Sequence, residues 1–555
     1  MTARNRLVAL ICAIVMVLGL FTVHAENETG APAFRGNGET LIIGIQGNAL
    51  VEDYENNYFT KLLEDALNVN LDFVVLPNAA KDFRTKVSMV LTTGPDIPDV
   101  FIGSFVNNTV YSYGQLGLIL PLNQWLEDDE TNRNWMSIKQ ADREMMLREM
   151  RAPDGNIYGF ASINNKLWNL LKYRTFINKV WLDELGLAIP TTTEELYQTL
   201  KAFAEEDPNG NGENDEIPAF GYVQGGVGYD IVAGLINAFT YYEPSKNGGL
   251  ALDEAGEKVI APYTTEEFRA GLEYVTQLCR ENLLPADVFT VDKTQYQAVL
   301  NAEPNTVGFT ITTSMSVWEN EYENENLHQM QIIEPLTGPE GVAYTAAIAP
   351  TSTIRYIIPT ACKNPELAYA LGEFMYDWNV GQVSRYGEPG VDFTSDPDVL
   401  KDYTCAAIEA GIDVDGFVLL RPGTDYDIQE DKHSKTWASV NPIYQGQTYD
   451  VDRILGFDSS NPSYTDKVEI FFYENYPQHM PEHMLPALVF DESVLDQIAT
   501  MQSEIKTFVS SAVAEFVTGQ RSLDDAGWQT YLDELETLGL SQMIELSQEA
   551  YDRGN

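Results

Sequence analysis

The residues with the clearest potential for chemistry form one short loop, Asp207–Glu216, with the sequence DPNGNGENDE. Oxygen-bearing side chains stand at loop positions 1, 3, 5, 9 and 10, and Gly212 stands at position 6, where the chain must turn sharply. Calcium takes six to eight oxygen ligands, and alternate side chains plus one backbone carbonyl supply them. The predicted calcium ligands are Asp207, Asn209, Asn211, Glu213 (through its carbonyl), Asp215 and Glu216.

The loop departs from the usual calcium pattern at position 12, where Pro218 replaces a bidentate glutamate. Glu216 or a bidentate Asp215 would then complete the ligand set. The alternative interpretation is a solvated Asn/Gly/Asp turn without metal. No general base stands beside the loop, so we expect a structural rather than a catalytic calcium ion.

Catalytic motifs are lacking in the sequence. It contains no Gly-x-Ser-x-Gly, His-Glu-x-x-His or Cys-x-x-Cys pattern and no phosphate-binding loop. Glycosidases use a pair of carboxylates. With 83 acidic residues in the chain, such a pair is expected by chance, so its presence does not indicate a glycosidase. We therefore expect no enzymatic activity, and a secreted two-carboxylate glycoside hydrolase is kept as the alternative.

Aromatic side chains are the other resource for binding. Trp168, Trp318 and Trp437 stand in polar, loop-like sequence rather than at core spacing. Neutral sugars have apolar C–H faces that stack on flat aromatic rings, while amides and charged groups bind their hydroxyls. Partial burial explains each tryptophan taken singly. As a set they indicate an aromatic-lined site.

The elements that would position such residues alternate between strands and helices. The first part of the chain is predicted as strand 41–45, helix 57–67, strand 71–76, helix 82–91 and strand 99–103. Strands separated by single helices pair in parallel, and ligands gather at their carboxyl ends. Asn48 and Asn107 follow the first and third strands, so both are predicted near the ligand.

Length and charge set the class of protein. The 555 residues exceed what one compact core usually contains, so two or more lobes are expected. Hydrophobic residues make up 44% of the chain, which excludes a disordered acidic polymer. The formal net charge of −49 excludes nucleic acid and anionic membranes as main partners and disfavours anionic sugars, unless a local arginine such as Arg385 admits one.

Residues 1–25 have the pattern of a cleavable secretory signal, because two arginines precede an apolar run that ends at Val23. We expect cleavage after Ala25; an uncleaved membrane anchor is the alternative. Ile11 before Cys12 is too bulky for a lipidation site, so no lipid anchor is expected. Residues 26–38 are polar and rich in Gly and Pro, which predicts a flexible tether.

Three cysteines follow the signal segment: Cys279, Cys362 and Cys405. An odd number leaves at least one thiol free, and the sequence does not decide whether any two are joined. Buried small hydrophobic side chains are the simpler interpretation.

Several stretches resemble the extracellular family 1 solute-binding proteins of ABC importers, in the branch that includes the alginate-oligosaccharide binders. The most specific stretches are Phe176–Leu187, Pro190–Thr192 and the loop Asp207–Glu216. Further matching stretches are Pro153–Gly155, Ile157–Gly159, Pro335–Pro339, Ser384–Glu388 with Gly390, and Gln548–Arg553.

The resemblance implies an α/β, two-lobed periplasmic-binding-protein-like fold of type II. Each lobe would be a mainly parallel sheet flanked by helices, with a hinge and an interlobe cleft. We place lobe 1 at 39–160 and 335–392, and lobe 2 at 161–334 and 393–555 with the calcium loop. It also implies a calcium ion at the loop ligands named above.

The function implied is a non-catalytic oligosaccharide receptor that delivers its ligand to the transmembrane subunits of an ABC permease. We expect a monomer that is secreted and either cell-surface associated or periplasmic. A binder of peptides or other solutes on the same fold is a further alternative. The predicted ligand contacts are the platforms Trp168, Trp318 and Trp437 and the polar residues Asn48, Asn107, Asn165 and Arg385.

Overall fold

The computed structural model describes most of the chain after the first 29 residues. The described residues are 30–164, 167–223, 228–319, 323–349, 351–394, 414–419, 431–445, 449–451 and 464–554. The predicted signal peptide, Asn165 and Cys405 therefore lie outside them.

The chain divides into two compact units. Among the described residues, unit 1 takes 30–164, 352–394 and 431–445, and unit 2 takes most of the remainder, 167–351 and 449–554. This grouping differs from the predicted lobes mainly in two segments, besides shifts of a few residues at the boundaries. Segment 431–445 belongs with unit 1 because Trp437 is buried there, and segment 335–351 belongs with unit 2.

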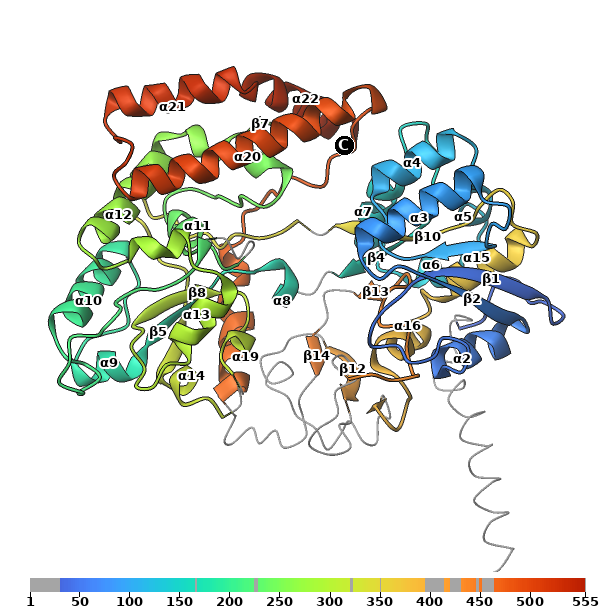
Figure 1. Ribbon diagram of the computed structural model, residues 1–555, viewed down its shortest axis with the longest axis horizontal. Helices are drawn as coiled ribbons and strands as arrows, with labels where there is room; N and C mark the ends of the chain where they lie inside the picture. The colour runs from blue at the N-terminus through green and yellow to red at the C-terminus, as the bar shows by residue number, and fades with distance from the viewer. Residues whose placement is uncertain are drawn as a thin grey trace, which may run out of the picture. The chain divides into compact units, whose positions relative to one another are not determined.

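Unit 1 is built around one mixed sheet with helices beside it (Figure 1). Its strands are β1 (Thr40–Gln46), β2 (Asn70–Leu76), β3 (Val100–Ile102), β4 (Phe160–Asn164), β10 (Ser352–Ile357), β11 (Phe393–Thr394) and β13 (Tyr444–Gln445). Its helices are α2 (Tyr58–Leu67), α3 (Ala80–Thr93), α4 (Asn107–Gln115), α5 (Asn123–Leu126), α6 (Arg133–Ser137), α7 (Gln140–Met150), α15 (Pro365–Phe374) and α16 (Trp378–Tyr386).

The sheet of unit 1 follows the strand order β13-β4-β10-β3-β1-β2. β1 pairs in parallel with both β2 and β3, as the alternation of strands and helices predicts. β10 comes from a segment much later in the chain and runs antiparallel to β3 and β4. Gly44 in β1 has no room for a side chain, since a Cβ there would lie 2.6 Å from the ring of Phe101.

Unit 2 has more helix than sheet. Its strands are β5 (Arg174–Asn178), β6 (Ala251–Leu252), β7 (Val259–Ile260), β8 (Phe309–Thr312), β9 (Met330–Ile333) and β14 (Tyr449–Val451), which pairs in parallel with β12 (Val414–Leu419). Its helices are α8 (Leu167–Leu170), α9 (Lys179–Glu184), α10 (Thr193–Glu205), α11 (Ile231–Ile236), α12 (Glu266–Arg280), α13 (Lys293–Leu300), α14 (Glu325–Gln329), α19 (Tyr464–Asn475), α20 (Leu495–Val517), α21 (Asp525–Thr537) and α22 (Leu540–Gly554).

The core of unit 2 lies between the sheet β8-β5-β9 and its surrounding helices. β5 is antiparallel to both neighbours, so the prediction of a mainly parallel sheet is wrong for this sheet. Its partners come from segments more than a hundred residues later, and the chain returns through them in the opposite direction. The helices α20, α21 and α22 pack against one another, and α20 also packs on α12 (Figure 1).

The α/β fold class and the division into two units agree with the prediction. The predicted tether is held to unit 1 where it is described: Gly30 N–H donates to Asn134 Oδ1 at 3.2 Å, and Gly36 N–H donates to the Leu67 carbonyl at 2.7 Å. Cys279 and Cys362 are free thiols. Among the described residues, none of the helices combines the length and the hydrophobicity needed to span a bilayer.

Candidate functional site

The candidate calcium loop begins directly after α10, whose start is set by its sequence. Thr192 and Glu195 form the predicted capping box: the Thr192 hydroxyl accepts from the Glu195 N–H, and the Glu195 carboxylate accepts from the Thr192 N–H at 3.2 Å. The helix ends at Glu205, and the chain enters the loop at Asp207. The loop is therefore anchored at its first ligand position.

Backbone donors inside the loop point at the predicted ligands. Asp207 Oδ2 accepts from the Gly212 N–H at 2.9 Å, and Asp207 Oδ1 accepts from the Asn211 N–H at 3.1 Å. Asn211 Oδ1 accepts from the Glu213 N–H at 2.7 Å. Gly212 has φ +80°, a left-handed conformation that favours glycine. The chain is thus wound around the side chain at position 1.

Asp215 closes the loop from the other end. Its Oδ1 accepts from the side-chain amides of Asn209 and Asn211, both at 3.1 Å. Five predicted ligand positions, 207, 209, 211, 213 and 215, are thereby joined in one hydrogen-bonded network centred on Asn211. The spacing seen in the sequence does bring these groups together.

Glu216, the last of the predicted ligands, has a carboxylate in an unusual environment. Both of its carboxylate oxygens are buried and lack a hydrogen-bond partner. Burial raises the pKa of Glu216, and the negative charges of Asp215 and Asp207 raise it further. Among the described residues no group of three or more His, Cys, Asp or Glu side chains is arranged to hold a metal. The loop instead mixes carboxylates, amides and a carbonyl, a donor set that fits Ca²⁺.

Two of the three predicted stacking platforms are core residues. Trp437 has no exposed surface; its Nε1–H donates to Thr60 Oγ1 at 2.8 Å, and its ring packs edge-on against Phe59. Trp318 is 2% exposed and packs edge-on against Phe176. Neither ring has a face open to a sugar, so the structure does not support them as platforms. Their polar neighbours in sequence were misleading, because tertiary packing buries both rings.

Trp168 differs from these two because it is only half buried. The Arg174 guanidinium lies 3.5 Å from the centre of its indole, and one of its Nη–H groups donates to the Trp168 carbonyl at 2.5 Å. Phe472 of α19 packs edge-on against the same ring at 4.8 Å. Sequence reasoning missed Arg174 and Phe472; the available signal was an arginine at the start of a strand whose other residues are uncharged.

The predicted polar contacts are dispersed. Asn48 is half buried after β1, and its Oδ1 accepts from the Leu50 N–H at 2.9 Å. Asn107 opens α4, and its side chain bonds the backbone of β10: Oδ1 accepts from the Ile354 N–H at 3.0 Å and Nδ2–H donates to the Ser352 carbonyl at 3.1 Å. Both polar atoms of the Asn107 amide are thus hydrogen-bonded to the backbone of β10, which stabilises the sheet.

Arg385 lies in the last turn of α16, with its guanidinium 5.4 Å from the ring centre of Tyr386. Its buried Nε has no hydrogen-bond partner. Asn165 lies outside the described residues.

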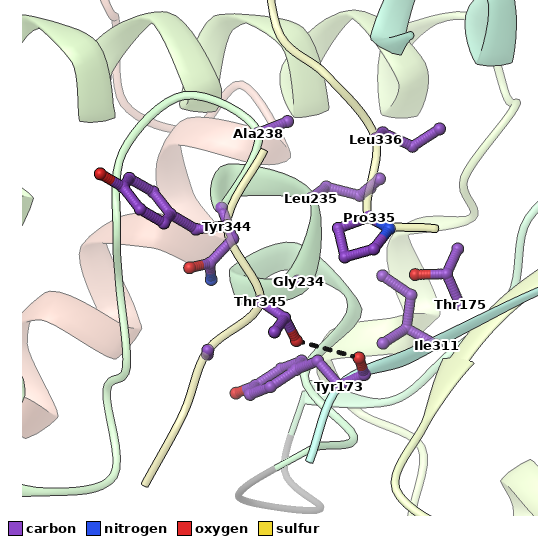
Figure 2. Close-up of a pocket in the computed structure, with 12 residues that line it drawn as sticks. Tyr173, Thr175, Gly234, Leu235, Ala238, Ile311, Pro335, Leu336, Tyr344 and Thr345 are labelled. Atoms are coloured by element: carbon purple, nitrogen blue, oxygen red, sulfur yellow. Dashed lines mark hydrogen bonds between the residues drawn. The ribbon is translucent and has the colours of Figure 1, made fainter. Parts of the chain in front are cut away.

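Two cavities inside unit 2 are too small for an oligosaccharide. Figure 2 shows the first, of about 20 Å³, where Thr345 Oγ1 donates to the Tyr173 carbonyl at 3.3 Å. That volume suits a single water molecule. The second, of about 110 Å³, lies between α11 and α20 beside Asp230, whose pKa burial raises to about 7. Sites for small ligands usually enclose about 300 Å³ or more.

No family model matches the chain. Among curated proteins, the chain is 23% identical over 518 residues to the fructooligosaccharide ABC transporter substrate-binding protein FusA of Streptococcus pneumoniae. The match covers 90% of this chain and 88% of FusA.

Solved structures share the fold. FusA in complex with kestose has a TM-score of 0.66 at 23% identity, covering 93% of this chain and 99% of that one. FusA has also been solved as an EF-hand mutant in complex with fructo-nystose. An HMO-binding, ABC-transporter-associated solute-binding protein from Bifidobacterium longum infantis has a TM-score of 0.71 at 19% identity, covering 93% and 99% of the two chains.

The alginate-binding protein AlgQ2, solved without calcium ion, has a TM-score of 0.57 at 19% identity and covers 94% of this chain and 100% of that one. The homologues are thus ABC-transporter substrate-binding proteins for oligosaccharides, and the resemblance found in the sequence is confirmed.

Proposed function

We propose that this chain, which matches ABC-transporter substrate-binding proteins over nearly its whole length, is the extracellular substrate-binding protein of an ABC importer for oligosaccharides. The observation that carries the proposal is the likeness to FusA, which spans 90% of this chain and 88% of the relative. It binds and releases sugar without cleaving it, in keeping with a sequence that has no catalytic motif.

Capture acts through a shift of populations. The sugar binds the transport-competent form more tightly than the free form, and the permease subunits recognise that form. Residues 1–25 direct secretion, and the protein works as a monomer outside the membrane. The net charge of −49 is then carried by solvated side chains on the protein surface, and it repels anionic surfaces.

Calcium is the proposed structural ion of the loop. Asp207, Asn209, Asn211, Asp215 and Glu216 offer side-chain oxygens and Glu213 offers its carbonyl. The two unpartnered Glu216 oxygens support this ligand set. The ion supplies positive charge that neutralises the carboxylates, and the loop in turn fixes the end of α10.

Isothermal titration of the purified protein with a panel of neutral oligosaccharides, kestose included, tests the proposal. Saturable binding of at least one sugar, with the sugar recovered intact after long incubation, is the expected result. Sugar hydrolysis at a steady rate would instead establish the glycoside-hydrolase alternative. Binding of peptides in preference to every sugar, neutral or charged, would establish the third.

A further inference from the structure

The larger of the two cavities described in unit 2, of about 110 Å³, has no part in the proposed function. Its apolar walls come from α11 and α20, through Val232, Ala233, Ile236, Val509 and Val513. A water molecule needs only about 10–15 Å³ of such space, and an apolar cavity of about 150 Å³ holds benzene. The cavity therefore has room for an organic molecule of a few carbon atoms.

The mouth of this cavity lies on the outer side of α20. Lys506 and Ser510 line the cavity and are exposed, whereas Val509 and Val513 line it and are buried. Positions 506, 509, 510 and 513 share one stripe of the helix, because residues three or four apart are neighbours on its surface. A small molecule can thus pass the two exposed side chains and reach the apolar walls.

Two hydroxyl groups at the cavity lack partners. Ser245 and Tyr263 both line it, and within the described part of the chain the hydroxyl of each is buried without a hydrogen-bond partner. Tyr263 is only 1% exposed, so bulk water does not hydrate its hydroxyl. Buried polar groups without partners are costly, and a ligand that donates a hydrogen bond to them removes that cost.

Asp230 adds negative charge to the same cavity. It lines the cavity, and its Oδ1 accepts from the Ala233 N–H at 2.9 Å, which caps α11. Burial, aided by the charge of Glu243, raises the pKa of Asp230 to about 7. Glu243 is itself 7% exposed, and its Oε2 is buried without a partner. Lys506 offsets part of the Glu243 charge from the mouth, so Asp230 is the acidic group left to a ligand.

We propose that this cavity binds the primary ammonium group of a short-chain aliphatic amine. The three N–H donors of an ammonium group match the oxygen acceptors of Asp230, Ser245 and Tyr263. The alkyl chain packs on the valines of α11 and α20. An opposite charge stabilises the ionised Asp230 against its burial, and the net charge of −49 attracts cations from solution. The proposal goes beyond the proposed function and does not depend on it.

Ligands of similar size that differ in charge and in N–H donors test the proposal. n-Butylammonium, 1-butanol and tetramethylammonium are titrated with the purified protein by ligand-observed NMR. We expect saturable binding of n-butylammonium, ~10-fold tighter than that of 1-butanol, because charge-assisted hydrogen bonds are the stronger ones. Tetramethylammonium, which has no N–H donor, should bind more weakly than n-butylammonium. Equal binding of 1-butanol would show an apolar cavity only and overturn the proposal, as would no saturable binding of n-butylammonium.

Substitutions with opposite expected signs locate the ammonium group. Asp230→Asn keeps a side chain that caps helices and removes the charge, so n-butylammonium affinity should fall ~10-fold while 1-butanol affinity stays level. Lys506→Gln removes a cation from the mouth and should raise n-butylammonium affinity about two-fold, less so at high salt. Glu504→Gln removes an exposed charge of α20 that does not line the cavity, and it should change neither affinity.

Tyr263→Phe gives a second measure that does not depend on the charge of Asp230. It removes only a hydroxyl without a partner, so the protein should fold with unchanged or higher stability and bind n-butylammonium more weakly. An unchanged n-butylammonium affinity in both Asp230→Asn and Tyr263→Phe would place the amine elsewhere and overturn the site. A weaker affinity in Lys506→Gln would contradict the sign of the charge that the cavity selects.

Discussion

The acidic loop at 207–216 and the cationic cluster of Trp168, Lys172, Arg174 and Phe472 lie in the same unit and are constructed in opposite ways. The loop is exposed, negative and made of ten consecutive residues. The cluster is largely buried and positive. It is assembled from α8 and the start of β5, which are adjacent in sequence, and from α19, about 300 residues later.

The difference lies in what holds the charges. In the loop, like charges crowd together, and the Glu216 carboxylate lacks a partner. In the cluster, two aromatic rings and backbone carbonyls surround the Arg174 guanidinium, and the negative charge of Glu469 on α19 acts on it. The two regions therefore differ in what offsets their charge: a bound calcium ion is proposed for the loop, whereas the cluster relies on packing and on groups of the protein itself.

The largest expected effect comes from breaking the packing of the cluster. Phe472 is fully buried and contacts the rings of Trp168, Tyr473 and Tyr476 at centroid distances of 4.8 to 5.2 Å. Phe472→Ala should lower the free energy of unfolding by about 3–5 kcal/mol, measured by urea denaturation. Phe472→Leu should cost less because it keeps more volume.

We expect this substitution to leave calcium binding by the loop unchanged. In Phe472→Ala the stabilisation by added calcium should equal that of the parent protein, since distant sites are additive. A calcium response altered by more than ~0.5 kcal/mol would mean that the two sites are coupled.

The next effect is removal of calcium. Chelation with EGTA should lower the melting temperature by several degrees, because a ligand at ~100 times its Kd stabilises the native state by about 2.7 kcal/mol. The double variant Asp207→Asn with Asp215→Asn should show no response to EGTA. Glu254→Gln removes an exposed charge of unit 2 outside the loop and serves as the control. An unchanged melting temperature together with no metal by elemental analysis would reject the site.

A smaller effect of opposite sign in the two metal states is expected for Glu216→Gln. Without calcium, burial and the charges of Asp215 and Asp207 disfavour the ionised Glu216 carboxylate, so its neutralisation should raise stability. With calcium, the same change removes a ligand oxygen charge and should lower stability. Thermal melts in EGTA and in calcium measure both. Destabilisation in both states would show that Glu216 is an ordinary structural residue.

The two regions also differ in how much of their structure could be predicted from the sequence. Loop geometry follows from local spacing, so Asp207, Gly212 and Asp215 could be assigned to one site from the order of residues alone. The capping box at Thr192 and the parallel strands β1, β2 and β3 are local in the same sense, and the structure confirms them.

Burial of single aromatic residues is not local. Trp318 and Trp437 have polar neighbours in sequence, yet they pack against Phe176 and Phe59 from distant segments. The contact of Arg174 with Phe472 depends on the packing of α19, which the sequence around Arg174 does not show. The direction of β5 depended likewise on which later segments pair with it.

The smallest effect distinguishes the two sites by pH. Burial, aided by the charge of Arg174, lowers the pKa of Lys172 to about 8, so its ammonium loses its proton within a moderate pH range. Because the folded-state pKa lies below the unfolded value, Lys172 destabilises the fold at pH 7 and regains that stability as the pH rises from 8 toward 10.5.

Lys172→Gln should flatten this rise in stability. Thermal melts between pH 7 and pH 10, for the parent protein and for Lys172→Gln, measure it. A rise that persists unchanged in the variant would assign the titration to another group.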